Sequence, residues 1–151
     1  MSHTYYLQQA FQHTHRKDAI EDAVFALSKH RKCFETIVVT GLSGTLIGPT
    51  VAYLMGKDLG VVRQRKSKHC DFKLEATKPI KNYIIIDDMV DTGDTIKKII
   101  KDVDSFYPNA ILYGVYCYQS NNPRPMSLWQ NVPCIGYNGD LYIKGEFQCG
   151  Y

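Results

Sequence analysis

The sequence has no apolar segment long enough to cross a membrane. Hydrophobic residues make up 44% of the 151 residues, but the longest apolar stretches fall well short of the ~20 residues that a membrane-spanning helix needs. The first 17 residues contain neither an apolar core nor a small-residue cleavage site, so we do not expect a secretory signal. These absences exclude membrane and exported proteins, and we expect a cytoplasmic protein.

Cysteine is sparse and scattered. The chain has five cysteines, an odd number, and no two of them form a C-x-x-C pair. This distribution fits a reducing compartment better than a disulfide scaffold or a zinc site. We expect the cysteines to be small buried hydrophobes. The five histidines also lack the spacing of metal ligands.

Repeats, low-complexity tracts and linkers are absent as well, so the 151 residues predict one domain, 1–151. The net charge of +3 is small, and it arises from one short segment of the chain. Within six positions this segment has four basic residues, more than the whole net charge: Arg63, Arg65, Lys66 and Lys68. No aromatic residues interleave with them, which argues against a nucleic-acid partner. The alternative to a functional cluster is a solvated run of charge.

Hydrophobic periodicity predicts strands and helices in alternation. The predicted strands are 36–40, 61–62, 83–86 and 110–118, and the predicted helices are 18–31, 45–57 and a third that follows a turn at 88–94. Asp18 and Glu21 resemble a capping box of the first helix, and Pro49 is expected near the first turn of the second. The charged segment 64–81 is expected to be a mobile loop or a β-arm. This alternation predicts an α/β fold, a parallel sheet with helices on both faces and ligand-binding loops at the carboxyl ends of its strands.

Residues 84–96 carry the strongest functional pattern. A buried strand ends in two adjacent carboxylates, Asp87 and Asp88, and a turn leads into a helix. Backbone N–H groups at a helix start, together with the hydroxyls of Thr92 and Thr95, suit a phosphate group. The paired carboxylates suit vicinal hydroxyls and a hydrated Mg²⁺. Together they fit a ribose 5-phosphate.

Segment 83–96 resembles the phosphoribosyl-pyrophosphate (PRPP) signature of type I phosphoribosyltransferases, in which apolar residues precede two acids and a Thr-Gly-x-Thr loop. The resemblance implies a Rossmann-like sheet with a flexible loop and a core at about 36–118. It also implies a small hood built from the N-terminal segment and about 120–151. The implied activity is Mg²⁺-dependent transfer of the 5-phosphoribosyl group of PRPP to a nitrogenous base in nucleotide salvage, with release of pyrophosphate.

The resemblance also implies roles for single residues. Asp87 and Asp88 would hold the ribose hydroxyls, directly or through water on Mg²⁺. The segment that would hold the 5-phosphate and neighbouring atoms comprises Val90, Asp91, Thr92, Gly93, Asp94 and Thr95. Asp91 corresponds to a general base in members that use 6-oxopurines. A helix N-cap is an equally good interpretation of Asp91.

Two further loops match the family by position. The first would bind pyrophosphate on its backbone amides, and it comprises Gly41, Leu42, Ser43 and Gly44. Gly-x-x-Gly turns are common, so this match gains its weight from its place one strand before the basic cluster. The second is the basic cluster, which resembles the start of a loop that closes over the site. There Arg63, with Lys66 or Lys68, would stabilise the charge of departing pyrophosphate.

Several alternatives remain in view. A ribose-phosphate pyrophosphokinase has a similar ribose-phosphate loop but needs a second domain, and a haloacid-dehalogenase phosphatase needs Asp-x-Asp, whereas Met89 stands at the required position. A non-catalytic PRPP-binding regulator could keep the loop and lose catalytic groups. Asp91 favours a 6-oxopurine acceptor, yet segment 116–122 lacks the lysine that such enzymes carry. Relatives commonly form homodimers, and we expect the same here.

Overall fold

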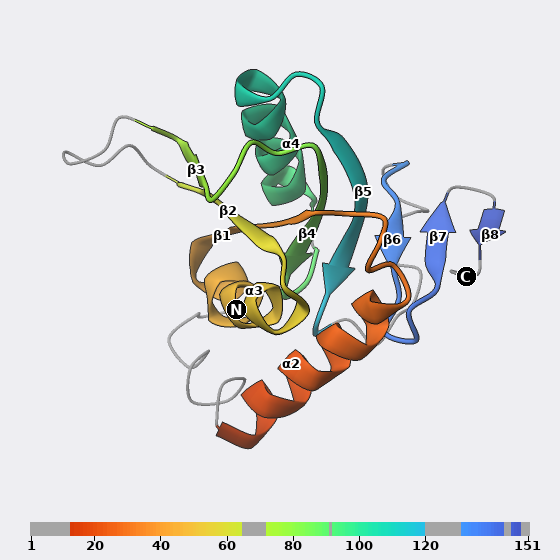
Figure 1. Ribbon diagram of the computed structural model, residues 1–151. Helices are drawn as coiled ribbons and strands as arrows, with labels where there is room; N and C mark the ends of the chain where they lie inside the picture. Colours follow the sequence, from red (N-terminus) through yellow and green to blue (C-terminus); the bar gives the residue numbers. More distant parts are fainter. Residues whose placement is uncertain (1–12, 65–71, 91, 120–130, 144–145, 149–151) are drawn as a thin grey trace.

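The computed structural model describes residues 13–64, 72–90, 92–119, 131–143 and 146–148. It contains one sheet with the strand order β3-β2-β1-β4-β5-β6-β7-β8 (Figure 1). The helices are α2 (His13–Ser28), α3 (Gly41–Met55) and α4 (Asp94–Phe106). The strands are β1 (Thr36–Thr40), β2 (Asp58–Val62), β3 (Leu74–Ala76), β4 (Asn82–Asp87), β5 (Ile111–Cys117), β6 (Cys134–Ile135), β7 (Leu141–Ile143) and β8 (Glu146–Gln148).

The five central strands, β2, β1, β4, β5 and β6, run parallel to one another. Strands β3, β7 and β8 pair antiparallel at the two sides of the sheet. Because parallel strands end at the same edge, the segments that follow β1, β2, β4 and β5 lie together. The predicted α/β architecture is therefore confirmed, and every candidate segment leaves this edge of the sheet.

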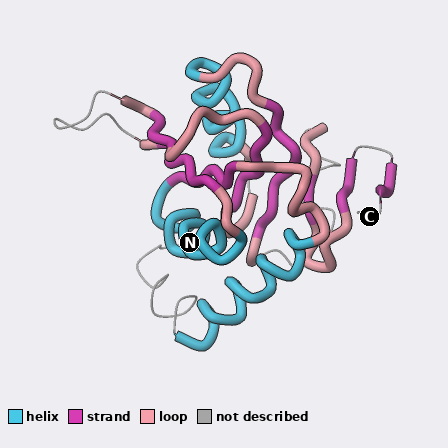
Figure 2. The backbone as a smooth tube through the Cα atoms, viewed as in Figure 1, coloured by secondary structure: helices cyan, strands magenta, loops and turns pink. Residues whose placement is uncertain are grey.

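Helices cover both faces of the sheet, as Figure 2 shows with strands in magenta and helices in cyan. Alternation along β4 explains this arrangement, since successive side chains of a strand point to opposite faces. Ile84 and Ile86 pack in the core that contains α2 and α3. Tyr83 and Ile85 pack in the core that contains α4. A strand apolar on both faces thus separates two hydrophobic layers.

Several predicted boundaries change in the structure, and the predicted helices 18–31 and 45–57 end earlier, at Ser28 and Met55. Helix α2 begins at His13, so Asp18 lies inside it and does not cap it. The predicted turn 41–44 is the first turn of α3, and Pro49 therefore lies well inside that helix. Proline has a helical φ, but inside a helix it removes one backbone hydrogen bond and its ring crowds the carbonyl four residues earlier, so it destabilises the helix at this position. Strand β2 starts at Asp58 rather than at 61, because it pairs with the whole of β1.

The charged segment 64–81 contains a β-arm, since β3 pairs antiparallel with β2. At the other side, β6, β7 and β8 extend the same sheet. The hood predicted from the N-terminal segment and 120–151 stays a prediction, because residues 1–12 and 120–130 lie outside the described part. Among the described helices, none is long and apolar enough to span a bilayer.

The expectation that the cysteines are buried holds for Cys117 and Cys134 but is wrong for Cys33, which is exposed. Cys33 lies in the short connection between α2 and β1, whereas Cys117 and Cys134 occupy strands of the sheet. Cys70 and Cys149 lie outside the described residues.

Candidate functional site

Two adjacent carboxylates lie where β4 leaves the sheet. Asp87 is the last residue of β4 and only 5% exposed, while Asp88 is half-buried. The Asp87 carboxylate accepts hydrogen bonds from Ser43 Oγ (2.9 Å) and from the backbone N–H of Asp88 (2.9 Å). The predicted pair of carboxylates is thus present. Hydrogen bonds hold Asp87 in place, and Asp88 lies nearer to solvent.

The environment of Asp87 favours its neutral form. Burial raises the pKa of the Asp87 carboxyl to about 6 from an ordinary value of 3.8, and the neighbouring Asp88 carboxylate adds to the rise. The hydrogen bonds from Ser43 and from the Asp88 amide lower the pKa and oppose this effect. A cation near the two carboxylates would stabilise the ionised form, because opposite charge lowers the pKa of a carboxyl group.

The start of α4 faces the same edge of the sheet, one short turn after the carboxylates. Gly93 caps the helix with a φ of +79°, and Asp94 is its first residue. The Thr92 hydroxyl accepts a hydrogen bond from the N–H of Asp94 (3.4 Å), and Thr95 is exposed. Val90 packs against the hydrophobic core on the α4 face. The N-cap interpretation of Asp91 is wrong, because Gly93 holds that position. Asp91 itself lies outside the described residues, so its predicted role as a general base stays a prediction.

The other predicted anion-binding segment, 41–44, comes to the same place as the start of α3. Ser43 lies beside Asp87, Leu42 is exposed and Gly44 is buried. Gly41 has a φ of +62°, and a Cβ there would lie 2.8 Å from Nε2 of Gln64. The positive φ favours glycine at this position, and a side chain here would displace the flexible amide of Gln64. The start of α3 therefore contacts the residues that follow β2.

Tyr118, which the sequence did not single out, joins these parts. Its hydroxyl donates to the backbone carbonyl of Ser43 (2.9 Å) and its N–H donates to the carbonyl of Asp87 (3.1 Å). The next residue, Gln119, donates its N–H to the carbonyl of Asp88 (2.9 Å). No local motif marks a tyrosine as a contact of this kind. Its position directly after β5 is the one signal that could have found it.

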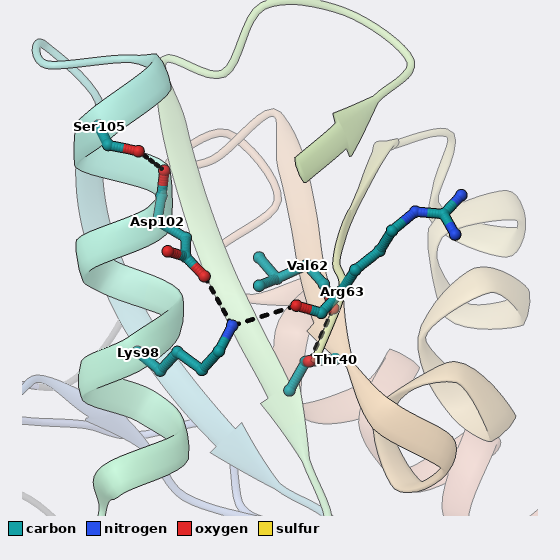
Figure 3. A network of polar contacts seen from close by, with 6 residues as sticks. All are labelled: Thr40, Val62, Arg63, Lys98, Asp102 and Ser105. Atoms are coloured by element: carbon teal, nitrogen blue, oxygen red, sulfur yellow. Dashed lines mark hydrogen bonds and ion pairs between the residues drawn. The ribbon is translucent and has the colours of Figure 1, made fainter. Parts of the chain in front are cut away.

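The beginning of the basic cluster is held by both neighbouring elements. The Arg63 guanidinium forms an ion pair with Glu75 of β3. Lys98 of α4 donates to the carbonyl of Arg63 (3.1 Å) and to the Asp102 carboxylate (2.7 Å), as Figure 3 shows. Lys66 and Lys68, like Arg65, lie outside the described residues, so the structure places one of the three predicted loop cations. Lys98 is a cation near this segment that sequence analysis missed.

The donor set at the edge of the sheet fits Mg²⁺. Asp87 and Asp88 offer hard carboxylate oxygens, and Mg²⁺ is commonly held by one or two carboxylates together with water and substrate phosphates. No group of three or more histidine, cysteine, aspartate or glutamate side chains gathers for a metal in the described part of the chain. The pair therefore suits a metal that arrives with a phosphorylated substrate, rather than a metal enclosed by protein ligands.

Comparison with known proteins identifies the fold. No family model matches the sequence, and no curated protein matches it either. Among solved structures, orotate phosphoribosyltransferase from Aeropyrum pernix aligns with a TM-score of 0.58 and 17% identity over 70% of this chain and 59% of that one. Orotate phosphoribosyltransferase from Francisella tularensis aligns with a TM-score of 0.64 and 11% identity over 84% and 67%. Adenine phosphoribosyltransferase from Thermoanaerobacter pseudethanolicus aligns with a TM-score of 0.54 and 23% identity over 74% and 70%.

These similarities show that the chain has the type I phosphoribosyltransferase fold, as segment 83–96 predicted. Two of these three solved structures are orotate phosphoribosyltransferases and one is an adenine phosphoribosyltransferase. The same fold therefore occurs in enzymes whose acceptor bases differ in charge and shape. The chain spans about three fifths of the length of the Aeropyrum protein.

Proposed function

We propose that this protein is a phosphoribosyltransferase that moves the 5-phosphoribosyl group of PRPP to a nitrogenous base. In this reaction the bond between ribose C1 and the pyrophosphate oxygen breaks, and pyrophosphate leaves with the electron pair. A ring nitrogen of the base forms the new bond to C1 with inversion and loses its proton. The proposal combines the fold with the side chains at the edge of its sheet.

One observation carries the proposal: the carboxylates at the end of β4 lie between two segments that suit anions. Ser43, at the start of α3, donates its hydroxyl to Asp87, and a single turn separates Asp88 from the start of α4. The start of a helix binds anions through its free N–H groups and its dipole. A ribose with phosphate groups at two positions, as in PRPP, matches this order of anion site, carboxylates and anion site.

Different residues of this chain would bind different parts of PRPP and assist the reaction. Asp87 and Asp88 would orient the ribose through its hydroxyls, and the N–H groups at Gly93–Thr95 would hold the 5-phosphate. The segment 41–44 would hold the leaving pyrophosphate. Mg²⁺, held by the two carboxylates together with PRPP, would neutralise charge on the leaving group. Asp91 would accept the proton from the attacking ring nitrogen, which favours a 6-oxopurine acceptor.

Substitution of the carboxylates tests the PRPP site. The double variant Asp87→Asn/Asp88→Asn should bind PRPP in the presence of Mg²⁺ at least about tenfold more weakly, because charged hydrogen bonds to the ribose and metal are lost. Isothermal titration calorimetry measures this directly. Glu21→Gln, which removes one exposed carboxylate from α2, is the matched control. Unchanged PRPP affinity in the double variant would refute the site.

Substitution of Asp91 separates chemistry from binding. Asp91→Asn should lower turnover by about 10²-fold or more while PRPP affinity stays within a factor of two, because a general base contributes to the transition state. The measurement is pyrophosphate release with each of a panel of free nucleobases, together with PRPP titration. Equal turnover in the variant and the native protein would refute the general-base role of Asp91.

The second candidate is a PRPP-binding regulator on the same fold. The ion pair between Arg63 and Glu75 favours it, since an arginine held by a carboxylate of β3 is not directed at a leaving group. PRPP binding without release of pyrophosphate in the presence of any nucleobase would support the regulator.

Assembly as a homodimer is part of our proposal, and sedimentation of the full chain tests it.

A further inference from the structure

The backbone of Arg63 is held in place by the elements around it. Its N–H donates to the carbonyl of Lys73 (2.7 Å), which extends the pairing of β2 with β3. Its carbonyl accepts a hydrogen bond from Lys98 of α4 (3.1 Å). One residue earlier, the carbonyl of Val62 accepts a hydrogen bond from the hydroxyl of Thr40 (2.7 Å). The side chain of Arg63 can therefore change its contacts while its backbone stays in place.

The Arg63 side chain lies on the α3 face of the sheet. Side chains alternate between the two faces along a strand, so Arg63 shares a face with Val61, which packs against the core that contains α3. Glu75 is the register partner of Val61, and paired residues of antiparallel strands point to the same face. In Figure 3 the Arg63 side chain accordingly extends away from Lys98. Arg63 and Glu75 thus share this face with α3.

The same face carries the segment 41–44, which would hold pyrophosphate. Strands β1 and β2 pair in register up to their last residues, so Gly41 and Arg63 are the first residues beyond two adjacent strands. The two segments also touch, because a Cβ on Gly41 would lie 2.8 Å from Nε2 of Gln64. The guanidinium of Arg63 can therefore turn from Glu75 towards an anion at the start of α3 without movement of the strands.

The ion pair between Arg63 and Glu75 is open to competition. The two side chains are 36% and 53% exposed, so water weakens their attraction. Pyrophosphate offers several charged oxygens, and arginine binds phosphate oxygens through paired, charge-assisted hydrogen bonds. An anion of this kind, held at the start of α3 by backbone N–H groups, is a stronger partner for Arg63 than a single exposed carboxylate.

We propose that Glu75 regulates the phosphoribosyltransferase site by holding Arg63 away from segment 41–44 until pyrophosphate, free or as part of PRPP, displaces it. This inference rests on the proposed function and adds a regulation of the same site. Because the ion pair must break before Arg63 can bind the anion, it lowers the apparent affinity for pyrophosphate. After transfer, Glu75 competes again for Arg63 and so favours release of the product.

A double-mutant cycle tests this exchange of partners. Calorimetric titration of the full chain with inorganic pyrophosphate and Mg²⁺ should show about threefold tighter binding in Glu75→Gln, because Arg63 has lost the competing carboxylate. In the Arg63→Met background, the same change at Glu75 should leave the affinity unchanged. Asp58→Asn, which should also leave it unchanged, is the matched control, since it removes a carboxylate from the other end of β2, where Asp58 pairs with Lys78.

The outcomes are decisive for Glu75. Unchanged or weaker pyrophosphate binding in Glu75→Gln, or no pyrophosphate binding by the native protein, would overturn the inference. An equal gain with and without Arg63 would also overturn it, because the gain would then come from general charge repulsion. Each of these results is compatible with PRPP affinity that depends on Asp87 and Asp88. Failure of the proposed function, in contrast, appears as PRPP affinity that does not depend on these two carboxylates.

Discussion

Asp87 combines two demands that oppose each other. It is nearly buried at the end of the central strand, yet its proposed role requires a negative charge. Burial disfavours that charge, and hydrogen bonds from Ser43 and from the Asp88 amide compensate only in part. In the proposed site, a bound cation would favour the ionised form of Asp87, which is otherwise destabilised by burial.

This conflict predicts a pH-dependent effect of Asp87→Asn. Because the folded-state pKa is raised from 3.8 to about 6, the stability contributed by protonated Asp87 is fully present below pH 3.8 and lost as the pH rises through 6. Above pH 6 the neutral asparagine should be the more stable residue, by up to about 3 kcal/mol. Its advantage should shrink as the pH falls from 6 towards 4.

Urea denaturation of both proteins at pH 4.5, 5.5 and 7.5, in metal-free buffer, measures this difference in unfolding free energy. Glu21→Gln controls for the general loss of one negative charge. An advantage that does not change with pH would contradict the assigned cause.

At the scale of elements, α4 does more than cover one face of the sheet. Lys98 reaches from the middle of α4 to the carbonyl of Arg63, directly after β2 (Figure 3). From the neighbouring strand, the hydroxyl of Thr40 donates to the carbonyl of Val62 (2.7 Å). Side chains of α4 and β1 thus hold the backbone where the basic cluster begins. The helix whose start would bind the 5-phosphate also supports the segment that would face pyrophosphate.

Removal of this support should destabilise the protein. In Lys98→Met, Asp102 keeps its buried position, at 7% exposure, without the ammonium group of Lys98. We expect a loss of about 1–2 kcal/mol, because a buried carboxylate loses a charged hydrogen bond. The double variant Lys98→Met/Asp102→Leu should be less destabilised than the sum of its single changes.

Urea denaturation at pH 7 gives these free energies, and Lys101→Met, at an exposed position of the same helix, is the control. A native-like stability of Lys98→Met would show that the contact contributes nothing to folding.

At the scale of the whole molecule, the sheet has a protected centre and exposed sides. Strand β4 pairs with both β1 and β5 and has apolar side chains in both cores. Strand β3 pairs only with β2 and ends the sheet. The proposed site lies at the carboxyl edge of the central strands, so Asp87 and Asp88 come at the end of a strand that is hydrogen-bonded to a neighbour on each side. Precise positioning of catalytic groups benefits from such rigid elements.

This arrangement predicts a gradient of amide hydrogen exchange. Amides of residues 84–86 should exchange only through global unfolding, whereas those of 74–76 should exchange through local opening at least about a hundredfold faster. Exchange measured by NMR at pH 7 compares them directly. Equal protection of β3 and β4 would mean that the sheet opens as one cooperative unit.

Much of the fold follows from local patterns. A β-branched run predicted β1 with its observed ends, and the apolar run before Asp87 predicted the core of β4. The sequence also predicted a helix after the turn that follows Asp88. The sequence did not predict that α2 starts at His13 or that α3 starts at Gly41. At both places the hydrophobic periodicity is too weak to define a helix end.

The sequence alone determined that two carboxylates leave a buried strand immediately before a helix, because strand periodicity and helix starts depend on neighbours along the chain. Only the tertiary structure decided which residues surround them. Tyr118 and Ser43 are 75 residues apart, and Lys98 and Arg63 are 35 apart, yet each pair is hydrogen-bonded. Such contacts arise from the packing of separate elements, which no local pattern of residues encodes.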